Sequence, residues 1–186
     1  MRAILLLVIL FISGCAAIEH KQTGETVYFQ PATSLTLSAP SAELLGNQWQ
    51  KRMYVTRGGS SKTLLSQLAI DDNGKVNLAV MTAVGIPVLT LTFDQVNGIQ
   101  AKEFVDLAGL NPQYILADIQ LVHWSATQLQ AHLQGAKINE YLSPRGQVRE
   151  VLDEERVIMT ITYEQNAVVL KNELRDYEIR FEEVIP

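Results

Sequence analysis

The feature that most constrains this chain is a two-residue alternation of apolar and polar side chains, which begins at Gln48 and returns in most later segments. Trp49, Met53 and Val55 alternate with polar residues in the first such segment. Because successive side chains of a strand point to opposite faces of a sheet, this period predicts half-buried β-strands. A chain built from such strands must bury one face of an antiparallel sheet.

Short turn sequences separate the predicted strands. Gly58-Gly59-Ser60-Ser61 and Asp71-Asp72-Asn73-Gly74 suit tight hairpins, and Gly85 and Gly98 interrupt the apolar pattern again. This spacing predicts consecutive antiparallel strands. We expect them over residues 48–57, 62–70, 76–80, 89–93, 99–105, 137–142, 147–152, 156–163, 168–174 and 177–184.

The periodicity becomes helical in the middle of the chain. Asn111-Pro112 is suited to cap and start a helix, and Ile115, Ile119 and Val122 then recur at helical spacing. The segment Ser125-Ala126-Thr127-Gln128 has the form of a capping box that opens a second, short helix. Two helices therefore interrupt the strands, and the predicted fold class is α+β.

The N-terminus has the form of a lipoprotein export signal. Arg2 precedes an apolar run, residues 3–12, which has the length of a signal-peptide core and is too short to span a bilayer. The run ends in Ile12-Ser13-Gly14-Cys15, which resembles the bacterial lipobox, where a cysteine is acylated and becomes the new N-terminus. We expect residues 1–14 to be removed and Cys15 to carry the lipid, the alternative being a cysteine buried in the core.

A lipid anchor determines where the protein is expected. Two or more acyl chains hold a protein stably on a membrane, and Ala16 stands where an aspartate retains lipoproteins at the inner membrane in enterobacteria-like sorting. The expected location is the periplasmic face of the outer membrane of a Gram-negative bacterium. Residues 15–47 are predicted to be a lipidated tether and leading segment, and residues 48–186 the β domain, with helices near 112–134.

The polar residues give no sign of catalysis, a cofactor or a metal. His20, His123 and His132 lack the spacing of metal ligands, and the last two are expected on helix surfaces or amphipathic faces. The segment Arg57–Lys62 contains glycines and a lysine but lacks the spacing of a phosphate-binding loop. A formal net charge of −5 without a basic patch argues against nucleic acid as a partner. We therefore expect a protein that is not an enzyme.

Diffuse motifs over about residues 48–183 resemble known families. Residues 75–93 resemble the strand, exposed apolar turn and strand of the LolA/LolB lipoprotein-localisation family, and residues 114–135 are similar to its helical insert. Thr63-Leu64-Leu65 and residues 116–121, followed by Trp124, resemble a family of proteobacterial outer-membrane lipoproteins classed as domain of unknown function 3261. The resemblance implies an antiparallel sheet curved into an incomplete β-barrel, with helices on its concave side and an apolar interior that accepts acyl chains.

Two sets of site residues follow from this resemblance. Val84, Gly85 and Ile86 correspond to the exposed turn that contacts the membrane or cargo, although valine stands where LolB has a larger leucine. A turn that folds back onto the core is the alternative. Nine further residues either line a lipid cavity or form an ordinary core: Leu64, Leu68, Val76, Leu78, Leu89, Leu91, Phe93, Leu121 and Trp124.

Two functions remain open at this stage. In the first, the anchored protein binds lipid, acyl chains or lipoprotein cargo in a hydrophobic half-barrel. In the second, it is an interaction or scaffold module that docks an envelope protein of an export system or of an aryl polyene or fatty-acid-type biosynthesis system. The presence or absence of a large apolar cavity distinguishes the two.

Overall fold

The computed structural model of the chain describes residues 25–105 and 111–184, and the predicted signal peptide, Cys15 and His20 lie outside these residues. Antiparallel strands make up most of the described chain, together with two short α-helices. The elements are β1 (Thr26–Gln30), β2 (Thr33–Thr36), η1 (Ala42–Leu44), β3 (Gln48–Arg57), β4 (Ser60–Ile70), β5 (Val76–Thr82), β6 (Pro87–Asp94), β7 (Gly98–Glu103), α1 (Pro112–His123), α2 (Ala126–His132), β8 (Leu133–Gln134), β9 (Lys137–Ser143), β10 (Gly146–Asp153), β11 (Arg156–Tyr163), β12 (Ala167–Asn172) and β13 (Tyr177–Glu183).

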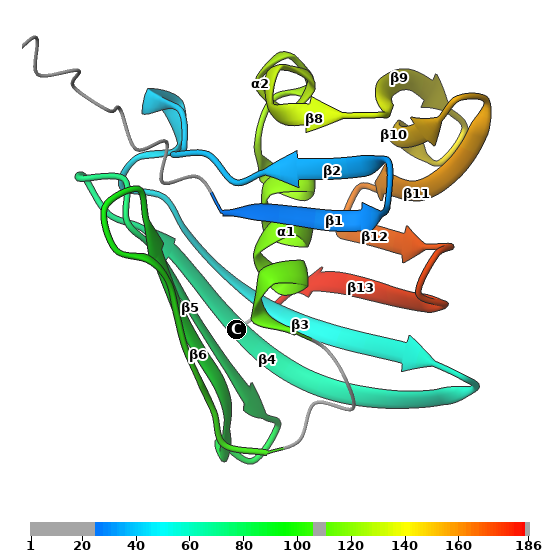
Figure 1. The fold of residues 1–186 in the computed structure, drawn as a ribbon. Helices are drawn as coiled ribbons and strands as arrows, with labels where there is room; N and C mark the ends of the chain where they lie inside the picture. The colour runs from blue at the N-terminus through cyan, green and yellow to red at the C-terminus, as the bar shows by residue number, and fades with distance from the viewer. Residues whose placement is uncertain (1–24, 106–110, 185–186) are drawn as a thin grey trace, which may run out of the picture.

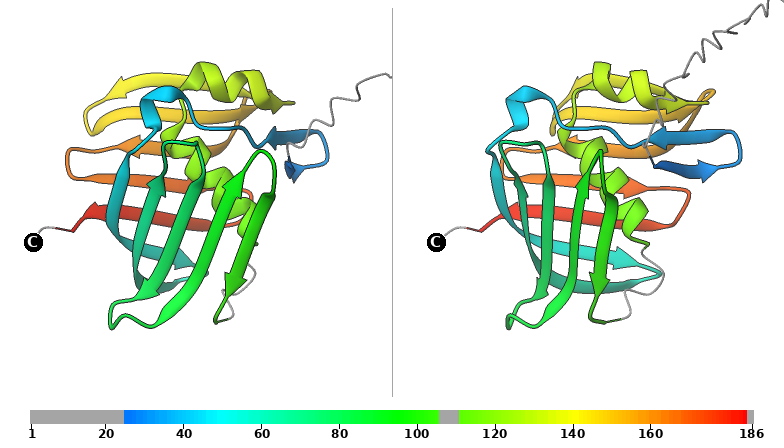
Figure 2. Two further views of the ribbon diagram at one scale, coloured as in Figure 1. Left: turned by 90° about the vertical axis from the view of Figure 1, so that its left-hand side faces the viewer. Right: turned by 60° about the vertical axis from the view of Figure 1, so that its left-hand side comes forward.

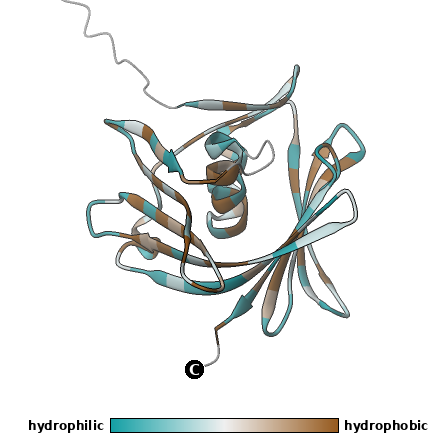
Figure 3. Ribbon diagram, turned by 90° about the horizontal axis from the view of Figure 1, so that it is seen from below, coloured by the Kyte–Doolittle hydropathy of each residue, from teal (hydrophilic) through white to brown (hydrophobic). Residues whose placement is uncertain are grey.

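Ten strands form one antiparallel sheet in the order β7-β6-β5-β4-β3-β13-β12-β11-β10-β9. Every neighbouring pair but one is a hairpin; the exception is β3 with β13, which places Tyr177 opposite Arg57 and Glu183 opposite Lys51. The sheet curves around α1 (Figures 1 and 3). Its edge strands, β7 and β9, do not pair with each other, so the sheet does not close into a barrel. The predicted antiparallel sheet with two helices is confirmed.

A second, three-stranded sheet joins the N-terminal strands to the middle of the chain. Its order is β1-β2-β8, with Leu35 of β2 opposite Leu133 of β8. This small sheet lies across the side of α1 that the large sheet leaves uncovered (Figures 1 and 2). Val27, Phe29 and Leu35 are buried in the main core. The part of the predicted leading segment from β1 onward therefore belongs to the packed domain, because its strands cover the helix.

The helix α1 is buried almost all round, since it lies between the two sheets. Its buried residues include Leu116 and Leu121, and also the polar Gln120. The Gln120 amide accepts a hydrogen bond from the Ser38 backbone N–H (3.1 Å) and donates one to the Ser38 carbonyl (3.0 Å). The Trp124 indole N–H donates to the Ala39 carbonyl (3.2 Å). These bonds satisfy buried polar groups and fix the chain at residues 38–39 against the end of the helix.

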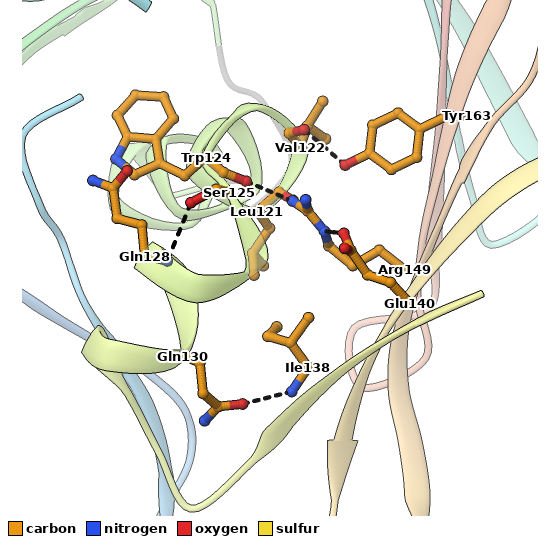
Figure 4. Close-up of polar contacts among 10 residues, drawn as sticks. All are labelled: Leu121, Val122, Trp124, Ser125, Gln128, Gln130, Ile138, Glu140, Arg149 and Tyr163. Carbon is orange, nitrogen blue, oxygen red and sulfur yellow. Dashed lines mark hydrogen bonds and ion pairs between the residues drawn. The ribbon is translucent and has the colours of Figure 1, made fainter. Parts of the chain in front are cut away.

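The C-terminal end of α1 is held by the large sheet (Figure 4). The guanidinium of Arg149 on β10 donates to the carbonyl oxygens of Leu121 (2.5 Å) and Trp124 (2.8 Å) and pairs with Glu140 (2.7 Å). The Tyr163 hydroxyl donates to the Val122 carbonyl (2.7 Å). Because the last carbonyls of a helix have no partner within it, these side chains complete the helix end and fix its position.

Both helix starts follow the prediction. The Asn111 side chain accepts from the Gln113 N–H (2.9 Å), with Pro112 in the first turn. The Ser125 hydroxyl accepts from the Gln128 N–H (3.2 Å) (Figure 4). The Gln128 side chain does not return to Ser125, as a full capping box requires; its amide donates instead to the Ala39 carbonyl (2.7 Å). Only half of the capping box forms, because this glutamine ties α2 to the N-terminal segment.

Candidate functional site

An apolar hollow lies between the concave face of the large sheet and one side of α1. It has a volume of about 90 Å³ and is partly open to solvent. Its walls come from six strands and one helix, so residues far apart in the sequence meet there. The residues that line it are Trp49, Lys51, Met53, Val55, Leu64, Ser66, Leu68, Leu78, Val80, Leu89, Ile115, Asp118, Ile119, Val122, His123, Val168, Ile179 and Phe181.

The size and lining of the hollow suit an apolar guest. One buried water needs roughly 10–15 Å³ of comparable space, so the hollow exceeds a packing defect. Fourteen of its eighteen lining side chains are apolar or aromatic, and only Lys51, Ser66, Asp118 and His123 carry polar groups. Sites for small apolar ligands have this composition: a mainly hydrophobic wall with a few placed polar groups.

Four of the nine residues predicted as core or cavity lining are in the hollow: Leu64, Leu68, Leu78 and Leu89. The other five are in the solid core: Val76, Leu91, Phe93, Leu121 and Trp124. The division follows position along the strands. In the β5–β6 pair, Val80 and Leu89 lie opposite each other at the hollow, whereas Val76 and Phe93 lie opposite each other at the other end, away from it.

The buried end of these strands is closed by the N-terminal segment. The Leu37 carbonyl accepts from the Gln95 side chain (3.4 Å) beyond β6, while residues 38 and 39 bond to α1 and to Trp124. Residues 37–39 cross the sheet at this end of the strands and fill the space around Trp124. The sequence does not indicate where this segment packs, so the loss of cavity there could not be foreseen.

Of the lining residues that were not predicted as such, six are on β3 and β13 and five are on α1. Trp49, Met53 and Val55 were recognised as one face of a strand, and this face points into the hollow. Ile179 and Phe181 join them because β13 pairs with β3. The apolar–polar alternation of both strands can be seen in the sequence. No local pattern indicates that β3 and β13, the first and last strands of the large sheet along the chain, are neighbours.

Asp118 is the buried carboxylate of the hollow, and only 5% of the residue is exposed. Its Oδ2 accepts a hydrogen bond from the Tyr177 hydroxyl, which in turn accepts from the Asn172 side-chain amide (3.2 Å). Its Oδ1 has no hydrogen-bond partner among the described residues. Burial raises the pKa of Asp118 to about 7, although the Tyr177 hydrogen bond and the positive charge of Arg175 act in the opposite direction.

His123 also lines the hollow, on an amphipathic face of α1, which is one of the two positions expected for it. Its ring lies 4.5 Å from that of Trp49, centroid to centroid. Burial lowers the pKa of His123 to about 4, and the positive charges of Lys51 and Arg149 lower it further. Lys51 forms an ion pair with Glu183 of the neighbouring strand. His132 is also half-buried, but it lies at the end of α2 and does not line the hollow.

The predicted apolar turn is exposed. Val84 is 82% and Ile86 55% exposed at the β5–β6 turn, where Gly85 has φ +83°. The Thr82 N–H donates to the Ile86 carbonyl (2.9 Å), and the Thr82 hydroxyl accepts from the Ile86 N–H (3.1 Å), so the turn is ordered. The alternative, a turn folded back onto the core, does not occur. Contact of this turn with membrane or cargo stays a prediction.

No group of three or more His, Cys, Asp or Glu side chains in the described part of the chain is arranged to hold a metal ion. Neither helix in residues 25–105 and 111–184 is long and apolar enough to cross a membrane.

Comparison with known proteins gives a family but no relative of known activity. No curated protein matches the chain. A family model described as "Protein of unknown function (DUF3261)" matches residues 48–184, which include the whole large sheet, both helices and every residue that lines the hollow. The match covers more than half of the chain, and the chain therefore belongs to the DUF3261 family.

Proposed function

We propose that this protein is a lipid-anchored lipoprotein at the periplasmic face of the outer membrane, and that it holds an acyl chain of a lipid or lipoprotein in the hollow without catalysing a reaction. The observation that carries the proposal is the hollow itself, an apolar space between sheet and helix that the side chains of the core do not fill. A protein that served only as a scaffold would gain stability by filling it.

The hydrophobic effect makes an acyl chain the natural guest. Each methylene group moved from water into an apolar environment contributes about 0.8 kcal/mol, so a segment of six methylenes contributes on the order of 5 kcal/mol. The nearly uniform apolar wall offers hydrogen bonds at few points, which disfavours sugars, nucleotides and other polar ligands. The guest is therefore a chain with a small polar end.

The remaining support comes from the sequence. The lipobox at Cys15 supplies an acyl anchor, and the exposed pair Val84 and Ile86 adds an apolar contact that would favour a lipid surface. The resemblance to the LolA/LolB family agrees with an open, curved sheet around a helix. In this proposal the anchor holds the domain on the membrane, and the hollow receives a chain from the lipid or from a lipoprotein.

The test is binding of a fluorescent apolar probe, N-phenyl-1-naphthylamine, by the chain from Ala16 onward, and its displacement by decanol. Every described strand, helix and core residue lies after residue 24, so this chain keeps the whole packed domain. Val168→Phe, which places a larger side chain in the hollow, should weaken binding strongly. Val96→Phe, on an 85% exposed residue of the β6–β7 turn, is the matched control and should bind like the parent.

Two results would contradict the proposal. Absence of probe binding by the folded parent would leave the scaffold function as the better account. Equal binding by the parent and by a folded Val168→Phe variant would mean that the probe binds elsewhere. Circular dichroism of each variant establishes that it is folded.

A further inference from the structure

The hollow contains one polar group that packing alone does not explain. Asp118 lies on the wall of α1, with Ile115 one turn before it and Val122 one turn after it, and all three residues line the hollow. An aliphatic side chain at this position would complete an apolar wall. A carboxyl group instead costs desolvation, which hydrogen bonds must offset.

The protein offsets only part of that cost. Tyr177 donates to Oδ2 of Asp118, while Oδ1 is buried without a partner among the described residues. A buried acceptor that is left unpaired destabilises the fold, and the cost is larger when the group is charged. Buried polar groups without partners are uncommon in proteins and call for a specific explanation.

We propose that Asp118 recognises the head of the guest, which is a single-chain amphiphile whose uncharged head offers an O–H or N–H donor to Oδ1. This inference rests on the proposed function, because it takes the acyl chain to lie in the hollow. The head would be a hydroxyl or an amide, and it would complete the hydrogen bonding of the carboxylate that Tyr177 begins.

The charges around Asp118 favour an uncharged head. The guanidinium of Arg175 already acts on Asp118 electrostatically. It is held next to this site by the Tyr114 ring, whose centroid lies 3.4 Å from Cζ, and it donates to the Tyr28 carbonyl (3.3 Å). An ammonium head would add a second positive charge beside the half-buried Arg175, and a carboxylate head would face the charge of Asp118. Both would carry a large desolvation cost into an apolar space.

The test compares ligands that differ only in the donor. Decanol and decanamide have an O–H or N–H donor. Their methylated partners, decyl methyl ether and N,N-dimethyldecanamide, keep the acceptor oxygen but have no donor. Displacement of N-phenyl-1-naphthylamine from the chain beginning at Ala16 gives the affinity of each ligand. Each affinity is then corrected for the ligand's free energy of transfer from water to alkane, because methylation also makes a ligand more hydrophobic. We expect each donor to bind about 10-fold or more tightly than its methylated partner, as for a hydrogen bond to a charged group.

Variants link this preference to Asp118. Asp118→Leu should bind both ethers and alcohols but lose the preference for the donor, while Asp72→Leu, on an exposed turn, should keep it. Tyr177→Phe removes the neighbouring hydroxyl and should keep the preference, since Oδ1 still accepts. If Asp118→Leu does not fold, the donor preference of the parent and the pH dependence of that preference still test the assignment to Asp118.

The preference should also depend on pH. Because the pKa of Asp118 is about 7, its carboxyl is increasingly protonated below that pH. The protonated carboxyl has an O–H donor of its own, which can bond to the acceptor oxygen of an ether or a dimethylamide. The preference for the donor ligands should therefore shrink as the pH falls from about 8 to about 6. The other charged or titratable groups near the carboxyl or in the hollow are Tyr177 on β13, Arg175 of the β12–β13 turn, Lys51 on β3 and His123 on α1.

The outcomes separate this inference from the proposed function. If none of the four ligands displaces the probe, the proposed function fails as well. If all four bind the parent equally after correction, the hollow accepts chains but Asp118 does not select the head, and the inference is wrong. A donor preference that persists in folded Asp118→Leu also overturns it.

Discussion

Replacing Asp118 with asparagine should change how the stability of the protein depends on pH. Burial raises the pKa of Asp118 from the ordinary 3.8 to about 7, so between these values the folded chain binds a proton that the unfolded chain does not. Stability contributed by this group therefore falls as the pH rises through that range. The full difference corresponds to about 4 kcal/mol as an upper limit, at about 1.4 kcal/mol for each pKa unit.

His123 has the opposite effect. Burial lowers its pKa from 6.5 to about 4, so between these values the unfolded chain binds the additional proton. Stability contributed by His123 therefore rises with pH over that range, by up to about 3 kcal/mol. The two slopes largely cancel between about pH 4 and 6.5 in the parent. Asp118→Asn removes one of them and should expose the rise due to His123.

Urea unfolding of the chain from Ala16, followed by circular dichroism at pH values from about 4 to about 8, measures this effect. The free energy of unfolding of Asp118→Asn minus that of the parent should increase by about 2–4 kcal/mol from the lowest to the highest pH. The exposed Asp72→Asn is the control and should run parallel to the parent. If Asp118→Asn also runs parallel to the parent, Asp118 is not a carboxyl with a raised pKa, and the reasoning is refuted.

Three further predictions concern the anchor, the tip and the small sheet. Mass spectrometry should find Cys15 acylated, and Cys15→Ala should leave the outer-membrane fraction; retention there would contradict lipid anchoring. The double substitution Val84→Glu and Ile86→Glu should leave the thermal midpoint nearly unchanged but weaken liposome association of the unacylated chain, and unfolding would mean that these exposed residues are needed by the core. In Gly135→Ala the new Cβ would lie 1.8 Å from the Ala32 carbonyl oxygen, at a residue with φ +69°. Urea unfolding should show a loss of more than about 1 kcal/mol, and parent-like stability would contradict the close approach.

The local structure could be predicted because it depends on neighbouring residues. The alternation of apolar and polar residues predicts β11 with the ends that it has in the structure, Arg156 and Tyr163. The pair Gly58 and Gly59, with φ +53° and +76°, forms the predicted tight turn between β3 and β4. Hairpins and helix caps depend on a few adjacent side chains, so local sequence patterns predict them.

The hollow depends on long-range pairing, which local patterns do not contain. The face of Trp49 and Met53 meets that of Phe181 only because β3 pairs with β13. Leu91 and Leu89 lie on the same face of β6, yet only Leu89 reaches the hollow. Periodicity shows which face of a strand is inward but not how deeply the helix and the N-terminal segment fill the space opposite it.

The same limit applies to the polar groups of the site. The sequence places Asp118 on the helix but gives no reason to pair it with Tyr177, which is 59 residues away. A charged residue among apolar helix positions is the one signal that could have drawn attention to it. Of the two positions expected for His123, a helix surface or an amphipathic face, the structure shows the second: the residue is half-buried on the side of α1 that lines the hollow.

The most direct test of the account is to locate a bound acyl chain. Nuclear Overhauser effects between uniformly ¹³C-labelled decanol and the methyl groups of the protein, in the chain from Ala16 onward, report which side chains the guest touches. The account predicts contacts to Ile115 and Ile119 of α1 and to Leu78 of the sheet, and none to the exposed Val96. Contacts confined to exposed methyl groups, or no bound decanol at all, would contradict the claim that the hollow is the binding site.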